Sequence, residues 1–189
     1  MSNLSMRHKF LLPLLFLFLI PAIIRAQSSP SSADAVMKEA FQQAAKEKKN
    51  VFVIFHASWC VWCHRMDSSM SDIMCKKFFD DNYVIRHLTV DESKDKKNLE
   101  NPGADAFRNK YGGNDLGIPY WLIFDPNGKL LADSRIRTDA NVDSKPGDNS
   151  GCPATEKEVD YFIKVLNQTS KLNTSEEAAI TKRFRENEH

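Results

Sequence analysis

The sequence has no excess of charge of either sign. Its 189 residues carry 26 basic and 25 acidic side chains, and no basic stripe occurs along the chain. Proteins that bind nucleic acid through its phosphates need a basic patch or face. The composition therefore gives no support for a nucleic-acid partner.

Close pairs of cysteines are scarce as well. The chain has four cysteines, of which only Cys60 and Cys63 are near neighbours, whereas Cys75 and Cys152 each stand alone. A structural zinc site usually draws on a second close pair of ligands. We therefore expect no metal site and no bound cofactor. The chain also has no internal repeat, so a repeat architecture is not expected.

A membrane-spanning run of apolar residues is missing too. The longest run, Phe10–Ile24, has 15 residues, contains two prolines and follows the basic segment Arg7–Lys9. That length is short for a membrane span and typical of a secretory signal, and Ala26 suits cleavage before Gln27. We expect residues 1–26 to be a signal peptide, with a retained membrane anchor as the alternative.

Export has consequences for charge and for the cysteines. Without residues 1–26 the chain has 23 basic and 25 acidic side chains, a net charge of −2. We expect a periplasmic or secreted protein without stable membrane insertion, in a compartment where disulfides persist.

Cys60 with Cys63 is the pairing that has a chemical rationale. Cys75 and Cys152 could form a structural bridge or remain two free buried thiols.

The most informative feature present is the motif Cys60-Val-Trp-Cys63. It directly follows the apolar run Val51–Phe55 and stands at the expected start of a helix. Two cysteines at this spacing can form and break a small disulfide ring. Unpaired N–H groups and the partial positive charge of a helix start favour a thiolate, the species that attacks disulfides. The motif therefore predicts thiol–disulfide exchange.

Hydrophobic periodicity and turn residues divide the chain into alternating helices and strands. Residues 27–32 are expected to be a flexible lead, 33–168 one domain, and 169–189 a helical extension. Helices are expected at 33–48, from Cys60 through Met70, at 72–79, 104–111 and 155–166, and from Thr174 onward. Strands are expected at 51–56, 83–90, 120–124 and 129–132, and loops at 93–103 and 138–153.

The order of these elements indicates the fold class. Strands separated by a helix imply a parallel pair, and the turn Asp125–Gly128 implies a hairpin that adds antiparallel strands to the same sheet. Capping boxes are expected at Thr155–Glu158 and at Thr174–Glu177. The sequence therefore predicts an α/β fold with a central mixed sheet flanked by helices on both faces.

The chain resembles the thioredoxin-like proteins. The resemblance is carried by the strand Val51–Phe55, by the segment Ala57–Cys63, and by Gly117-Ile118-Pro119 before another strand. It covers residues 33 to 168 and implies a three-layer thioredoxin fold, here with an added C-terminal helix. The continuation Cys63–Met66 is similar to exported bacterial thioredoxin-like proteins.

The resemblance implies roles for the matching residues. Cys60 is expected to be the exposed nucleophile and Cys63 the resolving thiol that attacks the mixed disulfide. Pro119 is expected to follow a cis peptide bond with Ile118 and to face the cysteines, where a substrate chain would pair with the backbone. The implied partners are protein dithiols or disulfides and a separate redox partner.

Residues that flank the cysteines are expected to modulate the site. Trp59 and Trp62 are candidate substrate contacts, with Trp62 exposed beside Cys60. Val61 and Trp62 replace the Gly-Pro pair usual in thioredoxin. His64 is expected to be partly exposed, with a charge that helps to hold a nearby thiolate.

The chain also departs from the thioredoxin pattern beneath the cysteines. Ile54 occupies the strand position where thioredoxin has an acid that helps to deprotonate the second cysteine. His87 replaces the lysine that accompanies that acid. We expect either His87 or water to act as the base for Cys63.

Two other interpretations remain open. The segment Cys60–His64 fits the attachment pattern of a c-type haem, with its histidine as an iron ligand. Met66 and Met70 are the nominal second ligands, but they share a helix with the cysteines, a poor position from which to reach the opposite haem face. The second interpretation is a non-catalytic binding or folding-assistance module, with the segment 138–153 and Trp62 as a peptide-binding surface.

Overall fold

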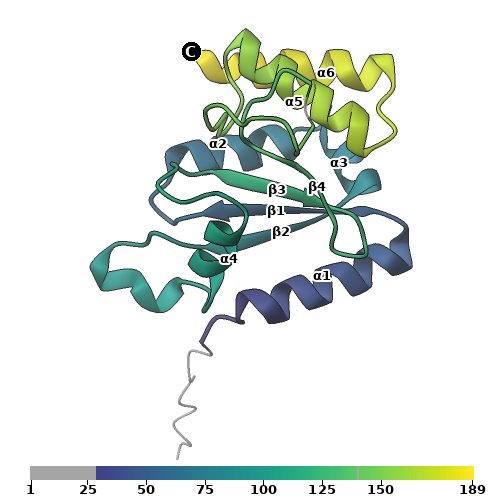
Figure 1. Cartoon of the computed structure of the whole chain (residues 1–189). Coiled ribbons are helices and arrows are strands. Elements are labelled where there is room, and N and C mark those ends of the chain that lie inside the picture. The colour runs from purple at the N-terminus through teal and green to yellow at the C-terminus, as the bar shows by residue number, and fades with distance from the viewer. Residues whose placement is uncertain (1–28, 140) are drawn as a thin grey trace, which may run out of the picture.

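The computed structural model describes residues 29–139 and 141–189 (Figure 1). The expected signal peptide, residues 1–26, lies outside the described residues, as do the first two residues of the expected flexible lead. Within the described part, no helix has the length and apolar character needed to cross a membrane.

A four-stranded sheet in the order β2-β1-β3-β4 forms the middle layer. β1 (Asn50–His56) is parallel to β2 (Tyr83–Thr89) and antiparallel to β3 (Tyr120–Phe124), which pairs antiparallel with β4 (Leu130–Asp133). The two central strands are covered on both faces, which is why they have continuous apolar runs rather than alternating polarity. The predicted mixed sheet is confirmed.

Helices cover both faces of this sheet (Figure 1). α1 (Ala33–Glu47) and α4 (Ala104–Lys110) pack on one face. α2 (Val61–Met70), α3 (Lys76–Asn82) and α5 (Glu156–Thr169) pack on the other. The three-layer thioredoxin fold is confirmed.

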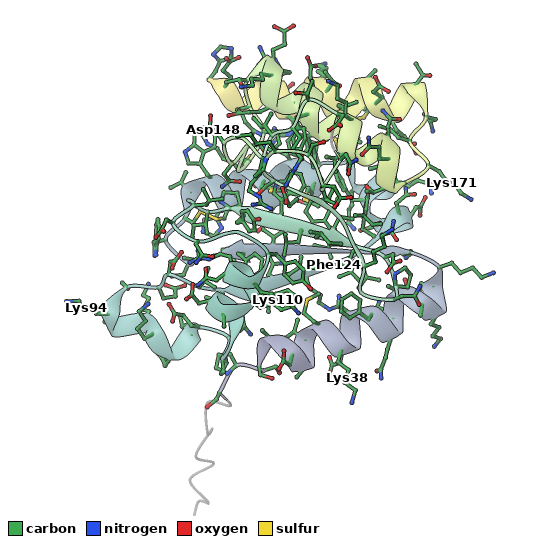
Figure 2. The ribbon with its side chains drawn as sticks, viewed as in Figure 1. Lys38, Lys94, Lys110, Phe124, Asp148 and Lys171 are labelled. Carbon is green, nitrogen blue, oxygen red and sulfur yellow. A yellow bond between two sulfur atoms is a disulfide. The ribbon has the colours of Figure 1, made fainter. Side chains whose placement is uncertain are left out.

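The pleat of the central strands divides their side chains between the two layers of helices. Phe52 faces the α2 and α5 side, whereas Phe124 faces the α1 side. Phe124 packs against Phe41 of α1 with ring centroids 5.8 Å apart, while Lys38 of the same helix points into solvent (Figure 2). α1 is therefore the amphipathic helix that its periodicity predicts.

The last long helix, α6 (Thr174–Arg185), joins the same core. It buries Ile180 and Phe184 in one cluster with Phe79 and Phe162. The rings of Phe162 and Phe184 lie 4.9 Å apart between centroids. The C-terminal extension therefore shares the hydrophobic core of the domain, and the short 3₁₀ helix Glu186–Glu188 follows it.

The helix expected at 72–79 has different bounds in the structure. It begins at Lys76 and continues to Asn82, directly before β2. Asp72 does not cap this helix, whose N-cap is Cys75 without a side-chain hydrogen bond; its carboxylate instead accepts a hydrogen bond from the N–H of Met74 at 2.9 Å. That bond closes a turn ahead of the helix, and so the predicted start is wrong.

Two further local expectations differ from the structure. The expected loop at 93–103 contains the 3₁₀ helix Lys94–Leu99. The final helix is capped by Asn173, which accepts hydrogen bonds from the N–H groups of Ser175 and Glu176, so the capping residue is not Thr174. The other predicted capping box, between Thr155 and Glu158, is confirmed.

Candidate active site

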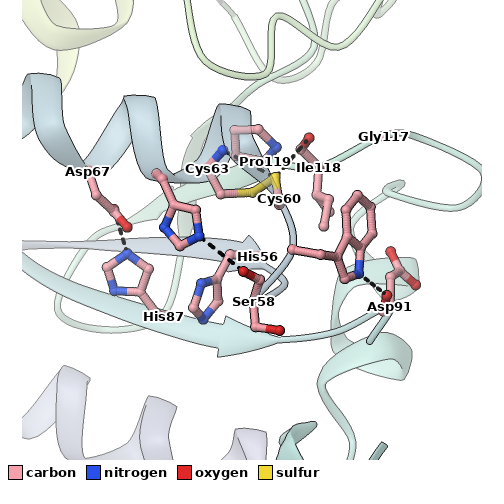
Figure 3. The surroundings of a disulfide bond; sticks show 12 residues. His56, Ser58, Cys60, Cys63, Asp67, His87, Asp91, Gly117, Ile118 and Pro119 are labelled. Atoms are coloured by element: carbon pink, nitrogen blue, oxygen red, sulfur yellow. Dashed lines mark hydrogen bonds and ion pairs between the residues drawn. A yellow bond between two sulfur atoms is a disulfide. The ribbon is translucent and has the colours of Figure 1, made fainter. Parts of the chain in front are cut away.

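Cys60 and Cys63 form a disulfide at the point where β1 leads into α2 (Figure 3). The bond is 2.09 Å long and the two Cα atoms lie 5.3 Å apart. Cys60 is the N-cap of α2, and its Sγ accepts a hydrogen bond from the N–H of Cys63 at 3.1 Å. In the reduced protein the same N–H and the positive end of the helix favour a thiolate at Cys60.

Both sulfurs are covered in this oxidised form. The exposed fraction is 3% for Cys60 and 1% for Cys63, so the expectation of an exposed Cys60 is wrong for the disulfide state. Ala57 and Ile118 pack against the pair. The carbonyl oxygen of Ile118 lies 3.6 Å from the Sγ of Cys60. A disulfide sulfur has no proton, so this contact becomes a hydrogen bond only when Cys60 is a thiol.

The loop opposite the disulfide contains the cis peptide bond between Ile118 and Pro119 (Figure 3). The expected cis bond is therefore confirmed. Asn149 fixes this loop, because its Nδ2 donates hydrogen bonds to the carbonyl oxygens of Gly117 at 2.7 Å and of Pro119 at 3.2 Å. Asn149 also accepts a hydrogen bond from the N–H of Gly151 at 3.1 Å. Sequence reasoning missed Asn149, which lay in a segment expected to be a surface loop.

Large apolar side chains surround the disulfide and face solvent. Trp59 is 57% exposed, Val61 63% and Trp62 44%, so the expected exposure of Trp62 is confirmed. The indole N–H of Trp59 donates to the carbonyl oxygen of Asp91 at 2.8 Å. The guanidinium of Arg65 lies 4.6 Å from the centroid of the Trp62 ring. These contacts orient the rings and leave an apolar rim that suits contact with a polypeptide.

The turn over residues 57–60 is held by the loop that follows β2. Glu92 is buried there, and its carboxylate accepts hydrogen bonds from the N–H of Ser58 at 2.6 Å and from its hydroxyl at 2.8 Å. Asp91, beside it, has a left-handed φ of 53° and forms an ion pair with Arg108 at 2.5 Å. Asp91, Glu92 and Arg108 belong to no local sequence motif, so the sequence alone does not mark them as part of the site.

The structure places His87 on the expected strand position, in register with Ile54 of β1. Its Nε2 lies 2.8 Å from the Oδ1 of Asp67, one helical turn beyond Cys63 (Figure 3). His56 lies beside it, with ring centroids 5.0 Å apart. Burial, and secondarily the charge of His87, lowers the pKa of His56 below its usual 6.5. His56, His87 and Asp67 therefore form a cluster of two histidines and one carboxylate next to the active-site helix.

The remaining histidine near the site bears on the haem interpretation. His64 is exposed, and its Nε2 lies 3.1 Å from the carbonyl oxygen of Ser58. Met66 and Met70 are buried in the core, and both cysteine sulfurs are bonded to each other. A c-type haem needs both sulfurs for its thioether links and a ligand on each face of the iron. These residues do not fit that group.

The two other cysteines are free thiols, and both are buried. The structural-bridge alternative is therefore wrong, and the alternative of two free buried thiols is confirmed. Burial raises the pKa of Cys75 to about 11 and that of Cys152 to about 12. Thiols held in the protonated form in this way are poor nucleophiles at neutral pH.

The fold and the bonded cysteine pair at a helix start define the class of this protein as a thiol–disulfide oxidoreductase. Residues 33–126 match the family described as thioredoxin-like. The chain belongs to the thioredoxin-like family.

Solved structures of low sequence identity are similar to this chain. A disulphide isomerase from Xylella fastidiosa Temecula1 is 19% identical, with a TM-score of 0.44 over 62% of this chain and 80% of that chain. The C-terminal domain of Neisseria meningitidis DsbD in the oxidised form is 18% identical, with a TM-score of 0.41 over 74% of this chain and 98% of that chain. The search of curated proteins finds no match.

Proposed function

We propose that this protein exchanges disulfides with protein substrates outside the cytosol, with Cys60 as the nucleophile and Cys63 as the resolving cysteine. The observation that carries the proposal is the Cys60–Cys63 disulfide at the start of α2, next to the cis-proline loop of Pro119. A thiolate at the first position and a second sulfur one turn into the helix are what a two-step exchange needs.

In the reducing direction, the Cys60 thiolate attacks one sulfur of a substrate disulfide. A mixed disulfide forms between Cys60 and that sulfur, and the other substrate sulfur leaves as a thiolate. Cys63, after losing its proton, then attacks the Sγ of Cys60. The ring disulfide forms, the second substrate thiolate is released, and two electrons have passed from the cysteine pair to the substrate.

In the oxidising direction, the same steps run in reverse. A substrate thiolate attacks the ring disulfide, and a second substrate thiol then resolves the mixed disulfide. The structure represents the oxidised state that begins this direction. Which direction prevails is set by the reduction potential of the Cys60–Cys63 pair relative to that of its partner.

Two features next to the disulfide support the proposal of a polypeptide substrate. Trp59, Val61 and Trp62 form an exposed apolar rim around the pair. The backbone of Ile118 lies against Cys60, where an extended substrate chain could form strand-like hydrogen bonds. The basic and apolar N-terminal segment supports export, since it has the pattern of a secretory signal.

The test is an insulin-reduction assay on the purified protein, with dithiothreitol as the electron source. We expect turnover by the native protein, none by Cys60→Ser, and accumulation of a mixed disulfide by Cys63→Ser. Absence of turnover in both the reducing and the oxidising direction would contradict the proposal. Full biological activity of Cys60→Ser would instead favour a binding module.

A further inference from the structure

The active-site turn contacts a buried carboxylate that no basic side chain neutralises. Glu92 is only 4% exposed, and it accepts hydrogen bonds from the N–H of Ser58 at 2.6 Å and from its hydroxyl at 2.8 Å. Among the residues that the structure describes, no lysine, arginine or histidine forms an ion pair with Glu92. Its neighbour Asp91, which lies beside the turn in Figure 3, does have such a partner in Arg108.

This carboxylate lies close to Cys60. The turn is tight, because the N–H of Cys60 donates to the carbonyl oxygen of Ala57 at 3.0 Å. The same peptide unit contains the N–H of Ser58, which donates to Glu92. The Oε1 of Glu92 is therefore within about 8 Å of the amide nitrogen of Cys60. At such a distance a buried charge acts strongly, because water and salt screen it less than at the surface.

The charged groups around the turn do not cancel this charge at neutral pH. Burial lowers the pKa of His56 below its usual 6.5, so that ring is neutral, and the charge of Glu92 only opposes the shift. His64 is exposed, so solvent screens any charge that it carries. Glu100 accepts the N–H of Glu92 at 2.8 Å and adds a second carboxylate, which Lys97 pairs at 2.6 Å. Glu92 therefore remains a buried negative charge beside the turn.

Such a charge acts on only one of the two redox states. The oxidised ring is uncharged, whereas the reduced pair carries a thiolate at Cys60, which the start of α2 favours. The carboxylate of Glu92 repels this thiolate and so destabilises the reduced pair. A pair whose reduced form is less stable is the stronger reductant. The helix start and Glu92 thus act in opposite directions on the same sulfur.

We propose that the buried carboxylate of Glu92 tunes the reduction potential of the Cys60–Cys63 pair and makes it more reducing than the start of α2 alone would. The proposal rests on the proposed function, because a potential matters only if the two cysteines exchange disulfides. This role goes beyond holding the turn, since a neutral side chain of the same shape would also accept the N–H of Ser58. It favours the reducing direction of exchange.

Redox equilibration with glutathione tests the proposal. At about pH 7, two glutathione thiols reduce the ring disulfide and leave as one glutathione disulfide, and alkylation with mass analysis gives the reduced fraction. In Glu92→Gln the side-chain carbonyl still accepts the N–H of Ser58, but the charge is gone. We expect the equilibrium constant for reduction to rise about threefold to tenfold, which makes the potential about 15–30 mV less negative.

The acidity of Cys60 should change together with the potential. In Glu92→Gln the alkylation rate of Cys60 should reach half its maximum at a lower pH than in the native protein, because the thiolate is no longer repelled. Both changes should persist in about 0.5 M NaCl, since salt screens a buried charge only weakly.

Two control variants separate the charge of Glu92 from its structural role. Ser58→Ala keeps the charge and loses one hydrogen bond, so it should be less stable but keep its equilibrium constant within about twofold of the native value. Glu100→Gln removes a charge of the same loop that Lys97 already pairs, and it should also change the constant by less than about twofold.

The outcomes separate the proposal from the proposed function. If the native protein does not exchange with glutathione, the proposed function fails. If it exchanges but Glu92→Gln keeps the native potential, the role of the charge is overturned and the function stands. A shift in Ser58→Ala or Glu100→Gln as large as that in Glu92→Gln would also overturn it, because the cause would then be the turn structure or the overall charge of the loop.

Discussion

The carboxylate of Glu92 accepts two hydrogen bonds from Ser58, one from its backbone N–H and one from its hydroxyl. Glu92 lies in the loop after β2, and Ser58 lies two residues before Cys60 in the turn after β1. Because these two strands are parallel neighbours, the segments that follow them meet at the same edge of the sheet. One loop thus holds the turn that presents the nucleophile.

Loss of the two hydrogen bonds between Glu92 and Ser58 should destabilise the protein. In Glu92→Ala the turn loses two hydrogen bonds to a buried carboxylate, which should lower the free energy of unfolding by about 1–2 kcal/mol. Urea denaturation of the oxidised protein measures this change. Glu39→Ala, on the exposed face of α1, is the control and should change stability by less than about 0.5 kcal/mol. An equal effect of the two substitutions would contradict the role of Glu92.

Asn187 should behave as a core residue despite its place near the C-terminus. Asn187→Ala removes the hydrogen bonds to Ser69 and Pro153 and should destabilise the protein by about 1–3 kcal/mol. Deletion of the exposed terminal His189 alone should have little effect. Thermal unfolding of the two variants compares them, and equal melting temperatures would show that the tail is not anchored.

The histidine beneath the active-site turn should make stability depend on pH. Burial lowers the pKa of His56, with the charge of His87 acting in the same direction. The unfolded chain therefore binds a proton at a higher pH than the folded chain does. Stability should fall as the pH drops below about 6.5, the usual value for histidine.

Chemical denaturation at about pH 7 and about pH 5.5 tests this dependence. The native protein should lose stability between the two values, and His56→Gln should lose less because the titrating group is gone. His189→Gln, at the exposed end of the chain, should behave as the native protein does. A loss in His56→Gln as large as in the native protein would show that other groups cause it.

The two buried thiols should not react with thiol reagents in the folded protein. Burial raises the pKa of both Cys75 and Cys152 and also blocks access to them. Ellman's reagent should therefore find no promptly reacting thiol in the folded, oxidised protein. It should find two after denaturation and four after denaturation with reduction. Prompt reaction of a thiol in the folded, oxidised protein would contradict the structure.

Features that depend on nearby residues could be predicted from the sequence. The run Val51–Phe55 indicated a buried strand, and the spacing of Thr155 and Glu158 indicated a helix start. The cysteine motif marked the site itself. The errors were also local, as at Asp72, whose side chain closes a turn ahead of the helix that it was expected to cap.

The residues that support the site could not be predicted in this way. Ser58 and Glu92 are separated by 34 positions, Gly117 and Asn149 by 32, and Ser69 and Asn187 by 118. Each is a common polar residue in a segment with no distinctive pattern. Its importance arises from which segments the sheet and the C-terminal helices bring together, and only the folded structure shows that.

The central claim is that the start of α2 makes the sulfur of Cys60 a thiolate at neutral pH. The most direct test is alkylation of the reduced protein by iodoacetamide over a range of pH, with mass analysis of the labelled peptides. We predict that Cys60 is labelled before Cys63 and reacts at half its maximal rate well below about pH 8.5, the midpoint for free cysteine. A rate profile equal to that of free cysteine, or labelling of Cys63 first, would contradict the account.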